Sequence, residues 1–258
     1  MLLKDKVVVI TGSTKGIGRG IALKCAEEGA KVVVSGFEKE IVATVEEEYA
    51  ALGYEAIGVE LDVRSEESMA NLMEKANARF GHIDALCANA GITDMCRFED
   101  MKPERFDRMI SINLRGVYLA NYMVLPYLKK NGGGKIVNTA SDCAINGWEY
   151  LSSYSAAKFG VRGLTQALAK EFGRYNINVN AVAPGIIETD MWDTTDQLLG
   201  ELKGQKPGEA WAAEVAKIPL GRGGKPEDLG NGVVMLLSKY ADYITGALLP
   251  VGGGSAML

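Results

Sequence analysis

Short apolar segments rich in β-branched residues alternate with longer helix-like segments along the whole chain, and this alternation constrains the fold more than any other feature. The strand-like segments are 7–10, 31–34, 56–59, 83–86, 135–137, 177–179 and 247–249. The helix-like segments are 18–28, 42–52, 65–80, 105–130, 154–175 and 226–238. Connections of this length allow right-handed crossovers between parallel strands. The pattern therefore predicts a doubly wound α/β fold, with seven mostly parallel strands covered by helices on both faces.

Length and charge narrow the class of protein further. The 258 residues suit one domain spanning 1–258 with a single sizeable core. The net charge of −5, from 28 basic and 33 acidic residues, lacks the basic excess of a nucleic-acid-binding protein. We therefore expect a small-molecule substrate and no nucleic-acid partner.

The cellular setting is predicted from the cysteines and the apolar runs. The four cysteines form no C-x-x-C pair and lie far apart, which is typical of reduced thiols. No apolar run approaches the roughly 20 residues that cross a bilayer, and the first residues lack a secretory signal pattern. We expect a cytoplasmic protein with no membrane association.

Residues 188–217 break the alternation, because tryptophans and leucines are scattered there among polar residues without a strand pattern. Long excursions in compact domains are often lids or binding loops. We predict a substrate loop over about 188–217, with Trp192 against the substrate. A surface insertion whose two tryptophans pack on the body of the domain is the alternative.

A glycine-rich turn follows the first strand and opens the first helix. Glycines there let the backbone come close to a pyrophosphate, and a helix N-terminus offers free N–H groups. The residues predicted to bind the cofactor in this turn are Gly12, Ser13, Thr14, Lys15, Gly16, Ile17 and Gly18. The spacing departs from the usual G-x-G-x-x-G fingerprint, and tight turns also need glycine for purely structural reasons.

Three further residues have the chemistry of proton transfer. Ser141 ends the fifth strand segment, and Tyr154 and Lys158 lie four apart on the following helix, hence on one face. A nearby ammonium favours the phenolate and lowers the pKa of a phenol. We therefore expect Lys158 to activate Tyr154 as the general acid and base, while Ser141 holds the substrate oxygen.

The motifs Thr11-Gly12-x-x-x-Gly16-x-Gly18, Asn89-Ala90-Gly91, Ser141 and Tyr154-x-x-x-Lys158 together resemble those of the short-chain dehydrogenase/reductase family. The resemblance covers essentially the whole chain and implies a Rossmann-like fold, an NAD(P) cofactor and a homotetramer. It implies that Asn113 completes a catalytic tetrad with Ser141, Tyr154 and Lys158. By the same resemblance, the remaining cofactor contacts are Asp62, Val63, Asn89, Ala90, Gly91, Pro184, Gly185, Ile187 and Thr189, together with Tyr154 and Lys158.

Residues near the catalytic motif have less specific interpretations. Cys143 and Trp148 fall where a substrate wall is expected, together with Ser141, Tyr154 and Trp192. No activating base accompanies Cys143, so a nucleophilic role is disfavoured. His82, the only histidine, has no metal-ligand spacing around it, and we predict no metal site.

The end of the second strand segment bears on the choice between NADP and NAD. An NAD enzyme usually places an acidic residue there, which binds the 2′-hydroxyl and repels a 2′-phosphate. Alignment with the family puts Gly36 at that position, followed by Phe37, a cofactor contact, and Glu38. Lys15 supplies a cation near the expected 2′-phosphate. We therefore predict NADP as the favoured cofactor, with NAD as the alternative if Glu38 bends inward to the ribose.

Three functions remain open. The first is an NAD(P)-dependent oxidoreductase that interconverts an alcohol and a ketone on a small hydroxy-ketone, polyol or sugar-like substrate. This reading follows from the resemblance of segment 184–192 and the loop after it to polyol, diol and acetoin members. The second is a reductase of 3-oxoacyl groups on an acyl carrier protein, and the third is a nucleotide-sensing regulator without catalysis.

Overall fold

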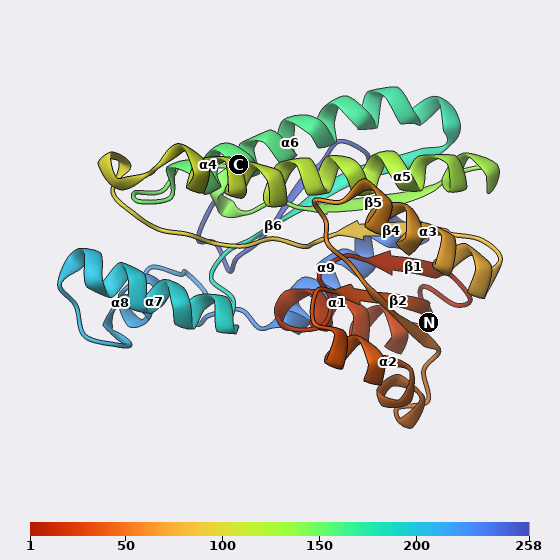
Figure 1. The fold of residues 1–258 in the computed structure, drawn as a ribbon, viewed down its shortest axis with the longest axis horizontal. Coiled ribbons are helices and arrows are strands. Elements are labelled where there is room, and N and C mark those ends of the chain that lie inside the picture. Colours follow the sequence, from red (N-terminus) through yellow and green to blue (C-terminus); the bar gives the residue numbers. More distant parts are fainter. Residues whose placement is uncertain (258) are drawn as a thin grey trace.

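The computed structural model describes residues 1–257 and contains one seven-stranded sheet (Figure 1). The strands are β1 (Val7–Ile10), β2 (Lys31–Gly36), β3 (Ala56–Glu60), β4 (Ala85–Ala88), β5 (Gly134–Thr139), β6 (Ile177–Pro184) and β7 (Leu248–Val251). Their spatial order is β3-β2-β1-β4-β5-β6-β7, and every neighbouring pair is parallel. The predicted doubly wound α/β fold is confirmed.

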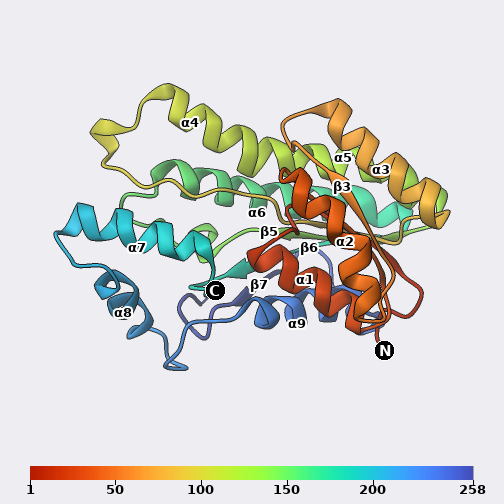
Figure 2. The same cartoon turned by 60° about the horizontal axis from the view of Figure 1, so that its bottom comes forward.

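Helices cover both faces of this sheet, as Figures 1 and 2 show. The helices are α1 (Gly16–Glu27), α2 (Lys39–Ala51), α3 (Glu66–Phe80), α4 (Pro103–Ile110), α5 (Gly116–Lys130), α6 (Ser152–Phe172), α7 (Asp190–Lys203), α8 (Glu209–Val215) and α9 (Pro226–Leu237). One apolar cluster joins the sheet to α3, α5 and α6. A second joins the other face to α1, α2 and α9. Among the described residues, none of the helices is long and apolar enough to cross a membrane.

The strands are apolar without interruption because both faces of the sheet are buried. Successive side chains of a strand point to opposite faces. In β1, Val9 packs in the cluster with α3, α5 and α6, whereas Val8 and Ile10 pack in the cluster with α1, α2 and α9. A polar residue at any of these positions would be buried without a partner.

The topology determines where a ligand can bind. From β1 the chain winds outward to β3, and then it returns to β4 and winds outward in the opposite direction to β7. The helices that follow β1 and β4 therefore leave on opposite faces, and a crevice opens at the carboxyl ends of these two strands. The glycine-rich turn follows β1, and Asn89 follows β4.

Two segments differ from the sequence-based expectation. The predicted helix over 105–130 is interrupted by a π-helical turn at Ser111–Arg115, which separates α4 from α5. Residues 188–217 lack strands but are not irregular, because they form α7 and α8, which project from the body of the domain in Figure 1. Asp196 ties the two helices together by accepting backbone N–H bonds from Gly208 and Trp211.

Candidate active site

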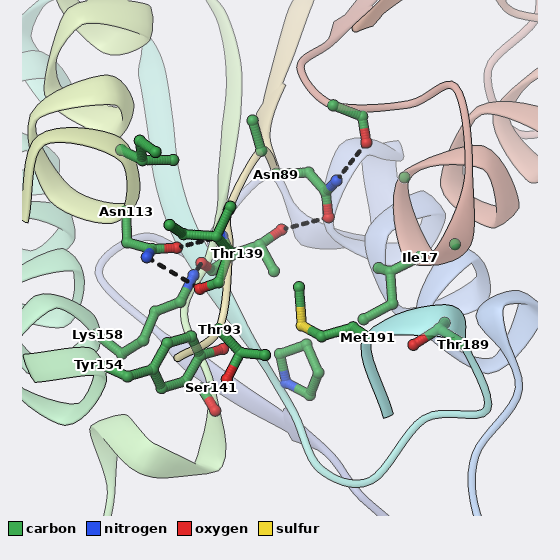
Figure 3. A pocket seen from close by; sticks show the side chains of 18 of the residues that line it. Ile17, Asn89, Thr93, Asn113, Thr139, Ser141, Tyr154, Lys158, Thr189 and Met191 are labelled. Atoms are coloured by element: carbon green, nitrogen blue, oxygen red, sulfur yellow. Dashed lines mark hydrogen bonds between the residues drawn. The ribbon is translucent and has the colours of Figure 1, made fainter. Parts of the chain in front are cut away.

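A cavity of about 600 Å³ lies at the carboxyl ends of the central strands (Figure 3). It extends from the glycine-rich turn past β4 and β5 to α6 and α7. Almost all the site residues predicted from the sequence line it, whereas Ser13 and Thr14 do not. A volume of this size is within the usual range for ligand and cofactor pockets.

The turn after β1 has a shape that only glycine allows. Gly12 and Gly16 have φ angles of +62° and +54°, in the left-handed region. A Cβ atom on Gly18 would lie 2.1 Å from the carbonyl oxygen of Gly12. No side chain caps the start of α1, and its first turn has no acidic residue. The free N–H groups therefore fit the pyrophosphate of a dinucleotide.

The residues around this turn hold it in place. The Ser13 hydroxyl donates to the carbonyl of Ile10 at 2.7 Å and accepts from the N–H of Ser35 at 3.0 Å. Ser13 is fully buried and links β1 to β2. Asn89 donates its side-chain N–H to the carbonyl of Gly12 at 2.9 Å and accepts from the Thr139 hydroxyl at 3.3 Å. The side chain of Asn89 thus connects the turn to β5.

Lys15 and Glu38 form an ion pair at the end of β2, where the adenosine ribose would lie. The Lys15 Nζ is 3.0 Å from Glu38 Oε1, and the Thr14 hydroxyl donates to Glu38 Oε2 at 3.0 Å. The Lys15 ammonium holds the pKa of the Glu38 carboxyl below its ordinary value, with burial acting in the opposite direction. Glu38 therefore bends inward as a carboxylate, and the cation on which the NADP prediction rests is already paired.

The other predicted contacts of the adenosine part lie beside this pair. Asp62 and Val63 line the cavity after β3, and Phe37, with 67% of its surface exposed, lines it after β2. Arg64, which the sequence reasoning did not single out, makes an ion pair with Asp62 at 2.6 Å. The Arg64 guanidinium holds the pKa of Asp62 below its ordinary value.

Tyr154 and Lys158 project from one face of α6 towards the cavity, and Ser141 lies opposite them after β5 (Figure 3). Lys158 Nζ donates to the carbonyl of Thr139 at 2.8 Å and lies 5.5 Å from the centre of the Tyr154 ring. The helical spacing thus brings Tyr154 and Lys158 to one face of α6, and the end of β5 brings Ser141 to the same cavity.

The electrostatics of this group differ from the expectation. Burial lowers the pKa of Lys158 to about 8. Burial also raises the pKa of Tyr154 well above its ordinary value, with the Cys143 thiol adding to the effect and the Ser141 hydroxyl opposing it. The expected lowering of the Tyr154 pKa by Lys158 is therefore not seen: burial is the largest cause, and the charge of Lys158 is not among the causes that act on Tyr154.

Asn113 lies in the π-helical turn and is fully buried. Its side chain accepts from the N–H of Ile92 at 3.1 Å and donates to the carbonyl of Ile92 at 3.0 Å. A Cβ on Gly91 would lie 2.5 Å from its Oδ1 atom. Single π-helical turns within α-helices often mark functional sites. Here the turn places Asn113 against the segment after β4 and beside the cavity.

The family model described as short chain dehydrogenase matches residues 6–199. The chain belongs to the short-chain dehydrogenase family. A 3-oxoacyl-acyl-carrier-protein reductase of Thermotoga maritima is 38% identical over 98% of this chain and 99% of its own length. A galactitol 2-dehydrogenase of Agrobacterium fabrum is 34% identical over the full length of both chains.

The similarity extends to a solved structure. The crystal structure of levodione reductase superposes with a TM-score of 0.90 at 36% identity, over 98% of each chain. This short-chain dehydrogenase is therefore an enzyme, an oxidoreductase of a family that generally uses NAD(P). The family membership and the enzyme class predicted from the sequence are confirmed.

The substrate end of the dehydrogenase's cavity is mostly apolar. Ser141, Cys143, Trp148 and Trp192, which the sequence placed at the substrate wall, line it. Residues that sequence reasoning did not assign to this wall are Met95, Leu151, Met191, Thr195 and Leu199. They could not be predicted from the sequence, because an apolar side chain that faces a cavity has the same sequence pattern as one that faces the core.

Trp192 and the last part of β6 close the cavity on the side of α7. The Trp192 ring meets that of Trp211 edge to face, with centroids 5.4 Å apart, so both tryptophans link α7 to α8. The predicted cofactor contacts Pro184, Gly185, Ile187 and Thr189 line the cavity between β6 and α7.

Cys143 and His82 are the two remaining side chains whose chemistry could suggest a further role in the site. Burial raises the pKa of the Cys143 thiol to about 12, which disfavours the nucleophilic thiolate. His82 Nε2 lies 3.0 Å from Asp84 Oδ2, a contact outside the cavity. Within residues 1–257, no group of three or more histidine, cysteine or acidic side chains is placed to hold a metal ion.

Proposed function

We propose that this dehydrogenase interconverts a secondary alcohol and a ketone on a small hydroxy-ketone, polyol or sugar-like substrate. One observation carries the proposal, namely that Ser141, Tyr154 and Lys158 meet at one end of a cavity whose other end is a phosphate-binding turn. When bound, the nicotinamide supplies or accepts the hydride. The similarity to a galactitol 2-dehydrogenase over the full chain supports a polar substrate with several hydroxyls.

Tyr154 transfers the proton in this proposal. Its raised pKa keeps the phenol protonated at neutral pH, so it can donate to the oxygen of a ketone during reduction. In the oxidation direction, the ammonium of Lys158 stabilises the phenolate that takes the proton from the alcohol. The Ser141 hydroxyl lies beside Tyr154 and orients the substrate oxygen, and Asn113 supports the segment that forms the cavity wall.

A screen of alcohols and ketones with NAD and NADP, followed by absorbance of the reduced nicotinamide, tests the reaction class. Substitution Tyr154→Phe is expected to lower turnover by about 10²-fold or more, the usual contribution of a general acid and base. Binding of the nucleotide should stay close to wild type, because the phenol acts on the proton. Retention of more than about a tenth of the turnover would contradict the role of Tyr154.

We propose NAD as the preferred cofactor, although the sequence favoured NADP. Glu38 accepts from Thr14 and pairs with Lys15, so its carboxylate is positioned to accept a hydrogen bond from a ribose 2′-hydroxyl. A 2′-phosphate would meet that same carboxylate and would have to displace it from Lys15. From the sequence, NAD is the alternative cofactor if Glu38 bends inward to the ribose, and Glu38 lines the cavity.

The second candidate function is reduction of 3-oxoacyl groups on an acyl carrier protein, and the similarity to the Thermotoga maritima reductase favours it. Docking of an acidic carrier protein requires a basic surface. Among the exposed cations that line the cavity, Lys15 and Arg64 are paired with carboxylates and only Arg108 makes no ion pair within residues 1–257, so we rank this function second. Turnover of a 3-oxoacyl thioester in preference to every small ketone in the screen would reverse the order. A purely regulatory role ranks last, because Ser141, Tyr154 and Lys158 converge on the cavity.

We also propose a homotetramer in the cytoplasm. Tyr118 and Tyr122 stack on α5 with 47% and 57% of their surfaces exposed, so they offer apolar area to another copy of the chain. Val117, on the same helix, packs instead in the protein's own core. Four buried cysteines without disulfides are consistent with a reducing compartment.

A further inference from the structure

Asp142 is a buried acid beside the catalytic serine, and the proposed mechanism makes no use of it. It follows Ser141 directly, lines the cavity and has 6% of its surface exposed. The Ser141 hydroxyl donates to Asp142 Oδ1 at 3.1 Å. A carboxylate is rarely buried so completely without a cation beside it, because desolvation disfavours the charge.

The second oxygen of this carboxyl lacks a proper partner. Asp142 Oδ2 is shielded from solvent and accepts no hydrogen bond of ordinary geometry, and the hydroxyl of Ser255 is also buried without one. Ser255 nevertheless lies near enough to favour the ionised form of Asp142. A Cβ atom added to Gly185 would lie 2.5 Å from the Ser255 hydroxyl oxygen, and one added to Gly252 would lie 2.4 Å from it. These two glycines therefore form the niche that holds the Ser255 hydroxyl.

The direction of the hydrogen on Ser141 decides which substrate oxygen it can bind. The Ser141 oxygen already accepts from the N–H of Cys143 at 3.1 Å. While its hydrogen points to Asp142, only a lone pair remains for the substrate, and a lone pair can accept from an alcohol but cannot donate to a ketone. If Asp142 itself carries a proton, it can donate to Ser141, whose hydrogen is then free for a ketone oxygen.

We propose that Asp142 is a positioning residue whose protonation selects the substrate form that Ser141 binds, the alcohol when Asp142 is ionised and the ketone when it is protonated. The proposal rests on the alcohol and ketone chemistry proposed above. It concerns substrate binding and not the equilibrium of the reaction, which no residue can change. A substrate oxygen at Ser141 would therefore be recognised differently below and above the pH at which Asp142 ionises.

The surroundings of Asp142 place its pKa within the pH range of the experiment described below. Burial raises the pKa of Asp142 to about 6, opposed by hydrogen bonds from the Ser141 hydroxyl, the Cys143 N–H and Ser255. The titratable neighbours are Cys143 in the same turn and Tyr154 on α6, and both are neutral at that pH because burial raises the pKa of each. Lys158 is the nearby cation, and its charge is not among the causes that act on Asp142.

The experiment measures the KM of the best ketone and of its alcohol from pH 5 to 8, at saturating cofactor. In the wild-type enzyme, the ketone KM should rise about tenfold or more as Asp142 ionises, as expected for loss of a hydrogen bond to the substrate. The alcohol KM should not rise with it. Substitution Asp142→Asn keeps the shape and can either donate to or accept from Ser141, so its ketone KM should be independent of pH in this range.

Ser255→Ala provides a second variant outside the catalytic group, and it should move the inflection to higher pH because it removes a contact that favours the ionised form. Carbon-13 NMR of aspartate-labelled protein supplies a readout without substrate, in which one carboxyl should titrate near pH 6 and disappear in Asp142→Asn. An inflection that persists unchanged in Asp142→Asn would overturn the proposal, as would a ketone KM that is constant in the wild type. Titration of Asp142 without turnover of any ketone would instead contradict the proposed function.

Discussion

Glu38 offers the sharpest test of how this enzyme chooses between its two possible cofactors. In the wild type, the carboxylate of Glu38 neutralises Lys15 across 3.0 Å, so the pair presents no net charge to a 2′-phosphate. Glu38→Gln keeps an acceptor for Thr14 but removes the negative charge and frees the ammonium. The net local charge thereby changes from zero to +1.

The magnitude follows from Coulomb's law. One unit charge at about 7 Å from a phosphate of about −2 contributes about 1 kcal/mol in water and about 5 kcal/mol at an effective dielectric constant of 20. The Glu38 side chain is 34% exposed, so screening by solvent favours the lower end of that range. We expect the ratio of kcat/KM for NADP to that for NAD to rise by about 1–2 kcal/mol, or roughly five- to thirtyfold.

Steady-state kinetics with both cofactors on one substrate measure this ratio. Lys15→Ala combined with Glu38→Gln is the matched control, and it should lose most of the gain because it removes the freed cation. If Glu38→Gln left the ratio unchanged, the ion pair would not lie at the ribose and the reasoning would be refuted. A wild-type preference for NADP of tenfold or more would refute the proposed choice of NAD, because Glu38 would then not accept from the ribose 2′-hydroxyl.

Three further predictions concern the turn, the buried acid and the assembly. Gly18→Ala should abolish binding of NADH, monitored by its fluorescence, because the added Cβ would lie 2.1 Å from the Gly12 carbonyl oxygen. Gly173→Ala is the control and should bind NADH normally, because a Cβ there meets no atom within 4 Å. Equal binding by both variants would argue against close packing of the turn. Asp142 has a folded-state pKa of about 6 against an ordinary value of 3.8, so the folded state holds more protons between these values and stability falls as pH rises through that window. Relative to Asp142→Asn, the wild type should therefore lose about 3 kcal/mol of unfolding free energy from pH 3.5 to pH 7, measured by urea denaturation, and a difference that does not depend on pH would show that Asp142 ionises without cost. Tyr118→Glu with Tyr122→Glu should reduce the mass found by light scattering if this stacked pair lies at an interface; a wild-type mass of one chain at micromolar concentration would exclude the tetramer.

Much of the fold could be read from local sequence because parallel strands buried on both faces are continuous apolar runs. The segments expected at 7–10 and 56–59 match β1 and β3 closely, and Ser65 caps α3 where the sequence placed the start of that helix. The helical nature of 188–217 was missed because α7 mixes polar residues with few buried ones, namely Thr195, Leu199 and Gly200. Packing against α8 stabilises α7, and the periodicity of the local sequence does not reveal that contact.

The grouping of Tyr154 and Lys158 could be predicted because their spacing is helical. Tyr154 and Lys158 lie four apart on α6, and any helix there places them on one face. Their pKa values could not be predicted in the same way. The sequence indicated that a cation would lower the pKa of the phenol, whereas the depth of burial of both groups decides the direction, and burial is a property of the packed structure.

The sequence by itself determined the order of strands and helices along the chain, the glycine-rich turn and the placement of Tyr154 and Lys158 on one helix face, because each depends on residues close together in the chain. Only the tertiary structure decided which partners distant residues have. It paired Lys15 with Glu38, 23 positions away, and the proposal of NAD rests on this contact. It also brought Ser255, near the C-terminus, to Asp142 in the niche formed by two glycines. Charge and burial at a site depend on every element that packs there, and no local pattern in the sequence records that packing.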